Sequence, residues 1–138
     1  MTARKIRQLE YYYAMVRDRP GEAYRLLAGL GAAGVNLMAF NAVPAGLELT
    51  QVVLFPDDPE LLAKVAQDRD LELNGPHHAL FIQGDDRLGA LAEIHSVLFE
   101  AGVNVAASSG VADGQGGYGY VIYLRAEDVA AAAKALEL

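Results

Sequence analysis

Two short stretches of the sequence place an acidic and a basic side chain shortly before a glycine. They read Asp18-Arg19-Pro20-Gly21 and Asp86-Arg87-Leu88-Gly89. Glycine lets a backbone pass close to a ligand, and free N–H groups at the start of a helix attract a carboxylate. An aspartate beside those N–H groups can accept hydrogen bonds from an ammonium group. Both stretches therefore have the chemistry of a receptor for a zwitterion.

The same side chains also have structural interpretations. Asp18 and Asp86 could simply cap the helices that follow them. Arg19 and Arg87 could clamp a carboxylate with two hydrogen bonds, or they could be solvated loop residues. We favour ligand binding for at least one of the two aspartates and a solvated position for the two arginines.

An internal repeat with a spacing of 68 residues relates the two stretches. Eight of the nineteen positions in residues 18–36 are identical in residues 86–104 without a gap, and these identities include Asn36 and Asn104. Half of them fall on Gly, Asn or Asp, which have special backbone roles. We therefore infer an internal duplication and two domains, residues 1–75 and residues 76–138.

Each copy predicts an amphipathic helix after its loop, because apolar residues recur at spacings of three and four. Gly34 and Gly102 follow these helices, where a left-handed cap is easiest. His95 stands where the first copy has Leu27, on the buried face of the helix. A buried polar group needs a partner. His95 is therefore either a pocket residue or a histidine held by a neighbouring group, and we favour the second.

Runs of apolar, β-branched and aromatic residues predict one strand before each helix and two after it. The expected strands are residues 11–16, 35–43 and 47–55, and then residues 79–83, 103–111 and 118–124. A second helix follows in each copy, beginning at Asp58-Pro59 and spanning residues 126–136. Residues 70–73 would add a final strand to the first copy. The second copy has no residues left for that strand, so we expect residues 4–9 or another chain to supply it.

Aromatic residues on the first strand point to both faces of its sheet. Tyr11 and Tyr13 share one face and Tyr12 lies on the other. We expect one face to pack on helices and the other on a second sheet or subunit, in preference to a stacking role with a ligand.

The β-α-β-β-α order of each copy is that of the ferredoxin-like fold. With Asp-Arg-Pro-Gly at the first strand-to-helix turn and Gly-Val-Asn after the helix, the chain resembles the ACT domain along nearly its whole length, as two tandem copies. The resemblance implies an α+β protein whose antiparallel sheets carry helices on one face. It also implies the binding of a small ligand, most often an amino acid, to regulate a metabolic enzyme.

The resemblance implies a ligand site at residues 16–21 and 83–89. Asp18 and Asp86 would contact the ligand there, and Asn36 and Asn104 would reach it across a domain or subunit interface. The alternative for the two asparagines is that they hold turn backbone. An aspartate where the family more often has asparagine favours a ligand amino group, and Leu88 in place of proline loosens a preset φ angle.

Composition excludes several other classes. The 138 residues carry a net charge of −7 and no cysteine, and they are 53% hydrophobic. This excludes wholesale disorder, thiol catalysis and thiolate metal sites, and it favours a cytoplasmic protein without a nucleic-acid partner. No apolar run approaches the roughly 20 residues that span a bilayer. His77 and His78 point to opposite faces of a strand, so no metal site is expected, and we expect no cofactor.

We therefore expect a non-catalytic, amino-acid-binding regulatory protein that forms a homodimer. An alternative is a ligand-free interaction subunit of an amino-acid biosynthetic enzyme, as in an acetolactate-synthase-like complex. A third class is a small enzyme that uses His95 and a tyrosine, although no catalytic motif is present.

Overall fold

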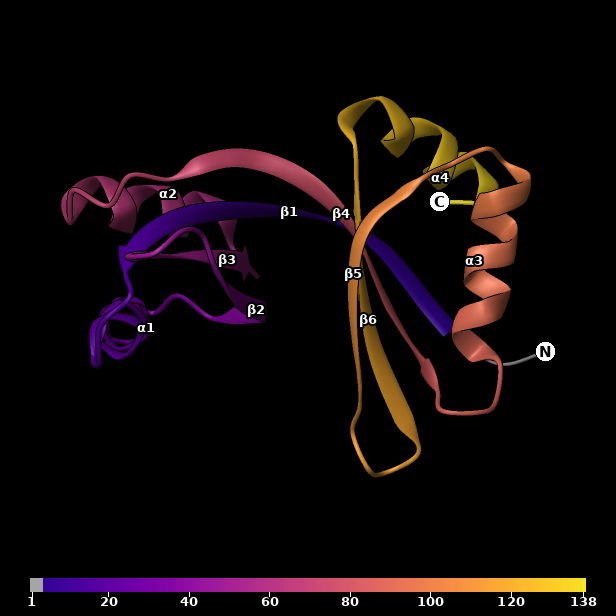
Figure 1. The fold of residues 1–138 in the computed structure, drawn as a ribbon, viewed down its shortest axis with the longest axis horizontal. Coiled ribbons are helices and arrows are strands. Elements are labelled where there is room, and N and C mark those ends of the chain that lie inside the picture. The colour runs from indigo at the N-terminus through magenta and orange to yellow at the C-terminus, as the bar shows by residue number, and fades with distance from the viewer. Residues whose placement is uncertain (1–3) are drawn as a thin grey trace. The chain divides into compact units, whose positions relative to one another are not determined.

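The computed structural model describes residues 4–138, which form six strands, four α-helices and one short 3₁₀ turn (Figure 1). In chain order these are β1 (Arg4–Arg17), α1 (Glu22–Ala32), β2 (Leu37–Pro44), β3 (Leu49–Pro56), α2 (Pro59–Asp68), β4 (Asn74–Asp85), α3 (Ala90–Glu100), β5 (Val105–Ala112), β6 (Gly117–Leu124), the turn Ala126–Asp128, and α4 (Val129–Ala135). The predicted β-α-β-β-α order is therefore confirmed for both copies.

The described chain divides into two compact units. The first unit is Glu10–His77, and the second unit combines residues 4–9 with His78–Leu138. Both boundaries fall inside long strands. One part of β1 and one part of β4 therefore belong to the first unit, and the other parts of these strands belong to the second unit. The strand order is β2-β3-β1-β4 in the first unit and β1-β4-β6-β5 in the second. This is the order of a four-stranded ferredoxin-like sheet in each case.

In the first unit, β3 pairs antiparallel with both β1 and β2. Because side chains alternate along β1, Tyr12 faces the helices and joins Leu54 of β3 in a buried core. Leu30 of α1 and Leu62 of α2 complete that core from the other side. Both helices therefore cover one face of the sheet, as expected.

The opposite face of this sheet carries the other two tyrosines of β1. The Tyr11 ring lies 5.0 Å from that of Phe55, and the Tyr13 ring stacks on His77 at 5.3 Å between centroids. Ring packing within the unit therefore accounts for both side chains.

The second unit repeats this arrangement, with β6 antiparallel to β4 and β5. Its core joins Leu80, Ile82 and Ile122 of the sheet to Ile94 and Leu98 of α3, with Ala132 of α4 packed among them. Ile6 of β1 packs against the same core. Residues 4–9 thus lie in the strand next to β4, at the position of a fourth strand.

Residues 70–73 do not form the predicted strand. Asp70 has a left-handed backbone with φ of 53°, and the N–H of Leu71 donates to the carbonyl of Ala66 to close the end of α2. This turn lies within the predicted strand 70–73, and the next strand, β4, begins only at Asn74. The helix predicted over residues 126–136 is also shorter, because a 3₁₀ turn precedes α4.

No helix within residues 4–138 is long and apolar enough to cross a bilayer.

Candidate functional site

The two Asp-Arg-x-Gly loops occupy equivalent places, one between β1 and α1 and the other between β4 and α3. Gly21 and Gly89 are the N-cap residues of these helices, with φ of 90° and 80°. A side chain would cost roughly 1 kcal/mol in this left-handed conformation. The backbone thus explains why glycine recurs at this position of the repeat.

Neither aspartate caps its helix, so the capping interpretation is wrong. Among the residues that the structure describes, no side chain caps α1 or α3. Instead, the backbone N–H of Asp18 donates to the Glu48 carbonyl at 2.9 Å, and that of Asp86 donates to the Gly116 carbonyl at 2.9 Å. These bonds fix each loop to the hairpin of its own unit and leave the carboxylates without a structural role at the helix.

A hollow opens at each loop. The first-unit hollow, of about 850 Å³, is lined by Arg17, Asp18, Arg19, Ala45, Gly46, Leu47, Glu48 and Leu49. The second-unit hollow, of about 480 Å³, is lined by Asp86, Arg87, Leu88, Gly89, Ala90, Leu91, Ala92, Gly110, Val111, Ala112, Tyr118 and Gly119. Each hollow therefore contains the aspartate and the arginine of its loop, whereas Pro20 and Gly21 shape the first loop without lining its hollow.

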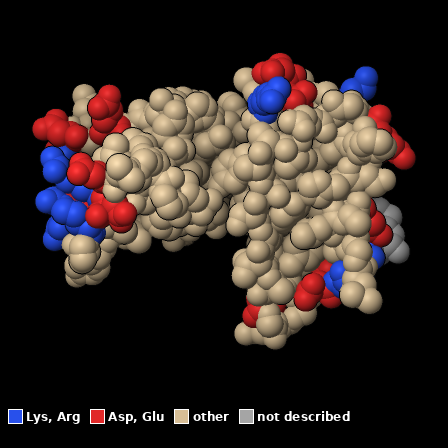
Figure 2. Space-filling view, in the orientation of Figure 1, with Lys and Arg blue, Asp and Glu red and all other residues tan. Residues whose placement is uncertain are grey.

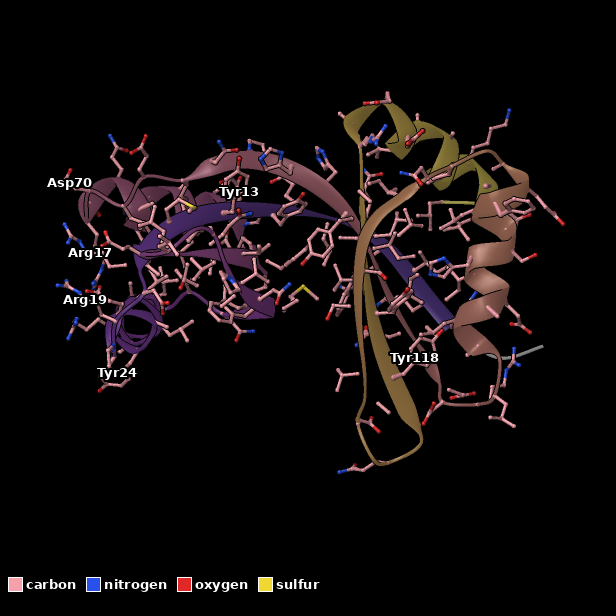
Figure 3. All side chains as sticks on the ribbon, in the orientation of Figure 1. Tyr13, Arg17, Arg19, Tyr24, Asp70 and Tyr118 are labelled. Atoms are coloured by element: carbon pink, nitrogen blue, oxygen red, sulfur yellow. The ribbon has the colours of Figure 1, made fainter. Side chains whose placement is uncertain are left out.

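The first hollow lies in a region rich in charge. Figure 2 shows basic and acidic side chains gathered over the end of the first unit that carries α1, and Figure 3 shows Arg17 and Arg19 at this same end.

Each loop arginine forms an ion pair with a glutamate, so it is neither an unpaired carboxylate-binding group nor a residue that contacts only solvent. Arg19 Nη2 donates to Glu22 Oε1 at 2.8 Å, and Arg87 Nη2 donates to Glu93 Oε2. A second guanidinium approaches each carboxylate, with Arg25 3.6 Å from Glu22 and Arg4 3.7 Å from Glu93. The hydrogen bond from the loop arginine is the main reason why the pKa of each glutamate lies below its usual range.

Sequence reasoning missed these two clusters. The spacing of Arg19 and Glu22 is a signal for a pair at i and i+3, but Glu93 lies six residues from Arg87 and its second partner comes from β1. The two glutamates are not equivalent in the repeat, because Glu22 aligns with Ala90 and Glu93 aligns with Arg25.

The asparagines after the helices do not line the loop hollow of their own unit. Asn36 Nδ2 donates to Asp57 Oδ2 at 3.4 Å, and the Asn36 carbonyl accepts from the Asp57 N–H at 3.0 Å. Asn36 thus holds the backbone between β3 and α2. Asn104 lines a separate hollow of about 440 Å³ in the second unit.

His95 lines that separate hollow together with Asn104, and it has a partner. Its Nε2 lies 2.7 Å from the hydroxyl oxygen of Tyr120, and the side chain is half-buried. The equivalent residues in the first unit are Leu27 and Val52. The pair is therefore a feature of the second unit alone, and the 25 residues between its members hid it from the sequence.

Within residues 4–138, no three His, Asp or Glu side chains are grouped so that they could hold a metal ion. His77 is hydrogen-bonded to Asn74 at 2.6 Å.

No protein-family model matches this sequence, and no curated protein matches it. Solved structures do resemble the chain. Protein BT0572 from Bacteroides thetaiotaomicron is 17% identical, with a TM-score of 0.81 over 96% of this chain and 88% of that one. The structure of aspartokinase alpha and beta subunits is 18% identical, with a TM-score of 0.64 over 99% of both chains.

The regulatory subunit of aspartate kinase from Thermus flavus is 15% identical, with a TM-score of 0.60 over 99% of this chain and 94% of that one. At these identities the likeness is one of fold. The chain thus has an α+β, ferredoxin-like fold that is shared with regulatory subunits of aspartate kinase.

Proposed function

We propose that this chain is a non-catalytic regulatory protein of two tandem ACT domains, which binds an amino acid at its loop hollows. One observation carries the proposal. In each unit a hollow opens at the Asp-Arg-x-Gly loop, and the aspartate and the arginine of that loop both line it. The two units keep this combination although most other lining residues differ.

The chemistry of each hollow suits a zwitterion. Asp18 or Asp86 would accept hydrogen bonds from the ligand ammonium group. Arg19 or Arg87, at the N-terminal end of a helix, would face its carboxylate. Binding would regulate a partner only if the ligand prefers one arrangement of the protein over another.

The fold supports the regulatory part of the proposal. Two of the similar solved structures are described as regulatory subunits of aspartate kinase, from Thermus flavus and Thermus thermophilus. By analogy, the partner of this chain would be an enzyme of amino-acid metabolism.

A second candidate is a ligand-free interaction subunit, and the exposed edge of β5 favours it. This strand lies at the end of the second-unit order, and its eight residues include no charged residue and no proline. Such an edge leaves backbone groups open to another strand. It could pair with an enzyme subunit, or with a second copy in the homodimer that we propose.

Thermal unfolding of the full chain with each of the twenty amino acids tests the first candidate. A ligand at 100 times its dissociation constant adds about 2.7 kcal/mol to the free energy of unfolding. The Asp18→Asn/Asp86→Asn variant should lose this stabilisation, because it removes both acceptors for an ammonium group.

The matched control is Asp68→Asn/Asp70→Asn, which removes the same charge at the exposed end of α2. This control should respond to the ligand as the wild type does. If no amino acid at millimolar concentration stabilises the wild type, the ligand-binding proposal fails and the interaction subunit remains.

A further inference from the structure

The two loop hollows are equivalent in the repeat but differ in chemical character. Four of the eight residues that line the first hollow are charged. Within residues 4–138, only Asp86 and Arg87 are charged among the twelve residues that line the second, and most of the others are apolar or glycine. The loop aspartate and arginine are therefore the same in both copies of the repeat, whereas the other residues that line the two hollows differ.

Tyr118 forms one wall of the second hollow because glycine faces it. Tyr118 of β6 pairs with Gly84 of β4, whereas the equivalent pair in the first unit is Thr50 and Val16. A Cβ atom on Gly84 would lie 2.9 Å from Tyr118 Cε1. The ring thus occupies the space that a side chain at position 84 would fill. It also packs against the second core, which holds it in place (Figure 3).

The rim of the second hollow exposes large apolar side chains to water. Leu88 of the loop is 99% exposed, Val111 of β5 is 72% exposed and Leu91 of α3 is 38% exposed. Exposed apolar surface beside polar groups is typical of a binding site. The equivalent first-unit residues are Pro20, Val43 and Ala23, and none of them lines the first hollow.

Charge and size limit what can occupy this hollow. Asp86 and Arg87 lie at the loop, and the apolar side chains extend from it along α3 and β5. A volume of about 480 Å³ is in the range of small-molecule sites. The matching ligand carries an ammonium and a carboxylate group at one end and an apolar chain at the other.

We infer that the second-unit hollow selects amino acids with an apolar side chain, which contacts Leu88, Val111 and the Tyr118 ring. The first-unit hollow differs because it combines exposed Leu47 and Leu49 with four charged residues, and within the described residues no aromatic ring lines it. This inference rests on the proposed function, because it assigns a ligand class to one of the two proposed sites.

Isothermal titration calorimetry of the full chain with a linear series of ligands tests the inference. The series is alanine, 2-aminobutyrate, norvaline and norleucine, with serine as a polar comparison. Each methylene that enters apolar surroundings contributes about 0.8 kcal/mol, so Kd should fall up to about fourfold per step. Serine should bind no more tightly than alanine.

A pair of equivalent substitutions locates the effect. Val111→Asp puts a charge on the rim of the second hollow and should weaken norleucine binding at least tenfold. Val43→Asp makes the same change at the equivalent position of β2 and should change Kd less than twofold. Both valines are exposed, so both variants are expected to fold, and circular dichroism checks this.

Each outcome decides the question. Binding that does not depend on chain length, or an equal loss in the two variants, overturns the inference but leaves amino-acid binding intact. If only polar amino acids bind, the inference also falls and the proposed function stands. If no amino acid binds the wild type, the inference and the proposed amino-acid binding are both wrong. A change of sedimentation in Val111→Asp would then indicate that a second copy covers this surface.

Discussion

Glu22 and Glu93 show that the two units reach the same local chemistry with different residues. Each carboxylate lies between two guanidinium groups, Arg19 and Arg25 in one unit and Arg87 and Arg4 in the other. Because the glutamates are not equivalent in the repeat, inheritance from a common ancestral unit does not explain this pairing. The contact holds each loop arginine beside its hollow, where a ligand carboxylate would compete with the glutamate for it.

These ion pairs predict a loss of stability in acid. The pKa values of Glu22 and Glu93 are lowered mainly by hydrogen bonds from arginine, and that of Asp113 by the backbone N–H groups of Gln115 and Gly117. At the acidic pH values where these carboxylates titrate, the unfolded chain therefore binds more protons than the folded chain does. The stabilisation should be complete above about pH 5.5 and should be lost as the pH falls below about 4.5.

Urea unfolding between pH 5.5 and pH 3 measures this dependence. The Glu22→Gln/Glu93→Gln/Asp113→Asn variant should lose less stability over this interval than the wild type does. The control, Glu60→Gln/Glu100→Gln/Asp68→Asn, changes three exposed carboxylates for which residues 4–138 provide no ion-pair partner. The idea is wrong if the first variant shows the same slope as the wild type.

At the scale of elements, β1 is unusual because its 14 residues are divided between the two units. Residues 12–17 pair with β3, and residues 4–9 lie next to β4. Ile6 packs against the second core and Arg7 lies over the Phe81 ring, 5.4 Å from its centroid. The N-terminal residues thus contribute to a core formed by residues more than 70 positions later.

Ile6→Ala should therefore destabilise the second unit. The side chain is half-buried, so the expected loss is about 1–2 kcal/mol in the free energy of unfolding, less than for a fully buried residue. Amide hydrogen exchange should also become faster in β4 and β6. Lys5→Ala removes an exposed neighbour and should cost less than about 0.5 kcal/mol. Equal effects of the two substitutions would contradict a structural role for this strand.

Local patterns predicted the helices and strands well because the signals lie within a few residues. Asp58 accepts a hydrogen bond from the Leu61 N–H and Pro59 opens α2, as the sequence indicated. Gly34 and Gly102 have φ of 85° and 72° after their helices. The strand over residues 70–73 was wrong because helix closure at Asp70 competes for those residues, and apolar alternation does not reveal that closure.

At the scale of the whole chain, the repeat predicted the two equivalent loops at which the hollows open. The spacing of 68 residues places Asp18 and Asp86 at equivalent turns, and both line a hollow. What the sequence did not predict depends on distant partners. Three such contacts join elements that lie apart in the repeat pattern. They are the hydrogen bond between His95 and Tyr120, the packing of the Tyr118 ring over Gly84, and the ion pair of Arg4 with Glu93.

The repeat also predicts how the two cores respond to the same substitution. Leu30 and Leu98 are identical positions of the repeat, each is 1% exposed, and they lie in cores that share no residue. Leu→Ala at a buried site costs about 2–5 kcal/mol, since transfer energy is lost and a cavity remains. Leu30→Ala and Leu98→Ala should each reduce the total free energy of unfolding by this amount.

Because the two sites have no common neighbour in their cores, the double variant should lose the sum of the two single effects to within about 0.5 kcal/mol. Urea unfolding of the four proteins measures this difference. Leu27→Ala is the control on α1, because Leu27 is 36% exposed and its loss should cost well under 2 kcal/mol. An interaction energy above about 1 kcal/mol would mean that the two cores are energetically coupled. A ligand in one hollow could then influence the other unit through the same coupling.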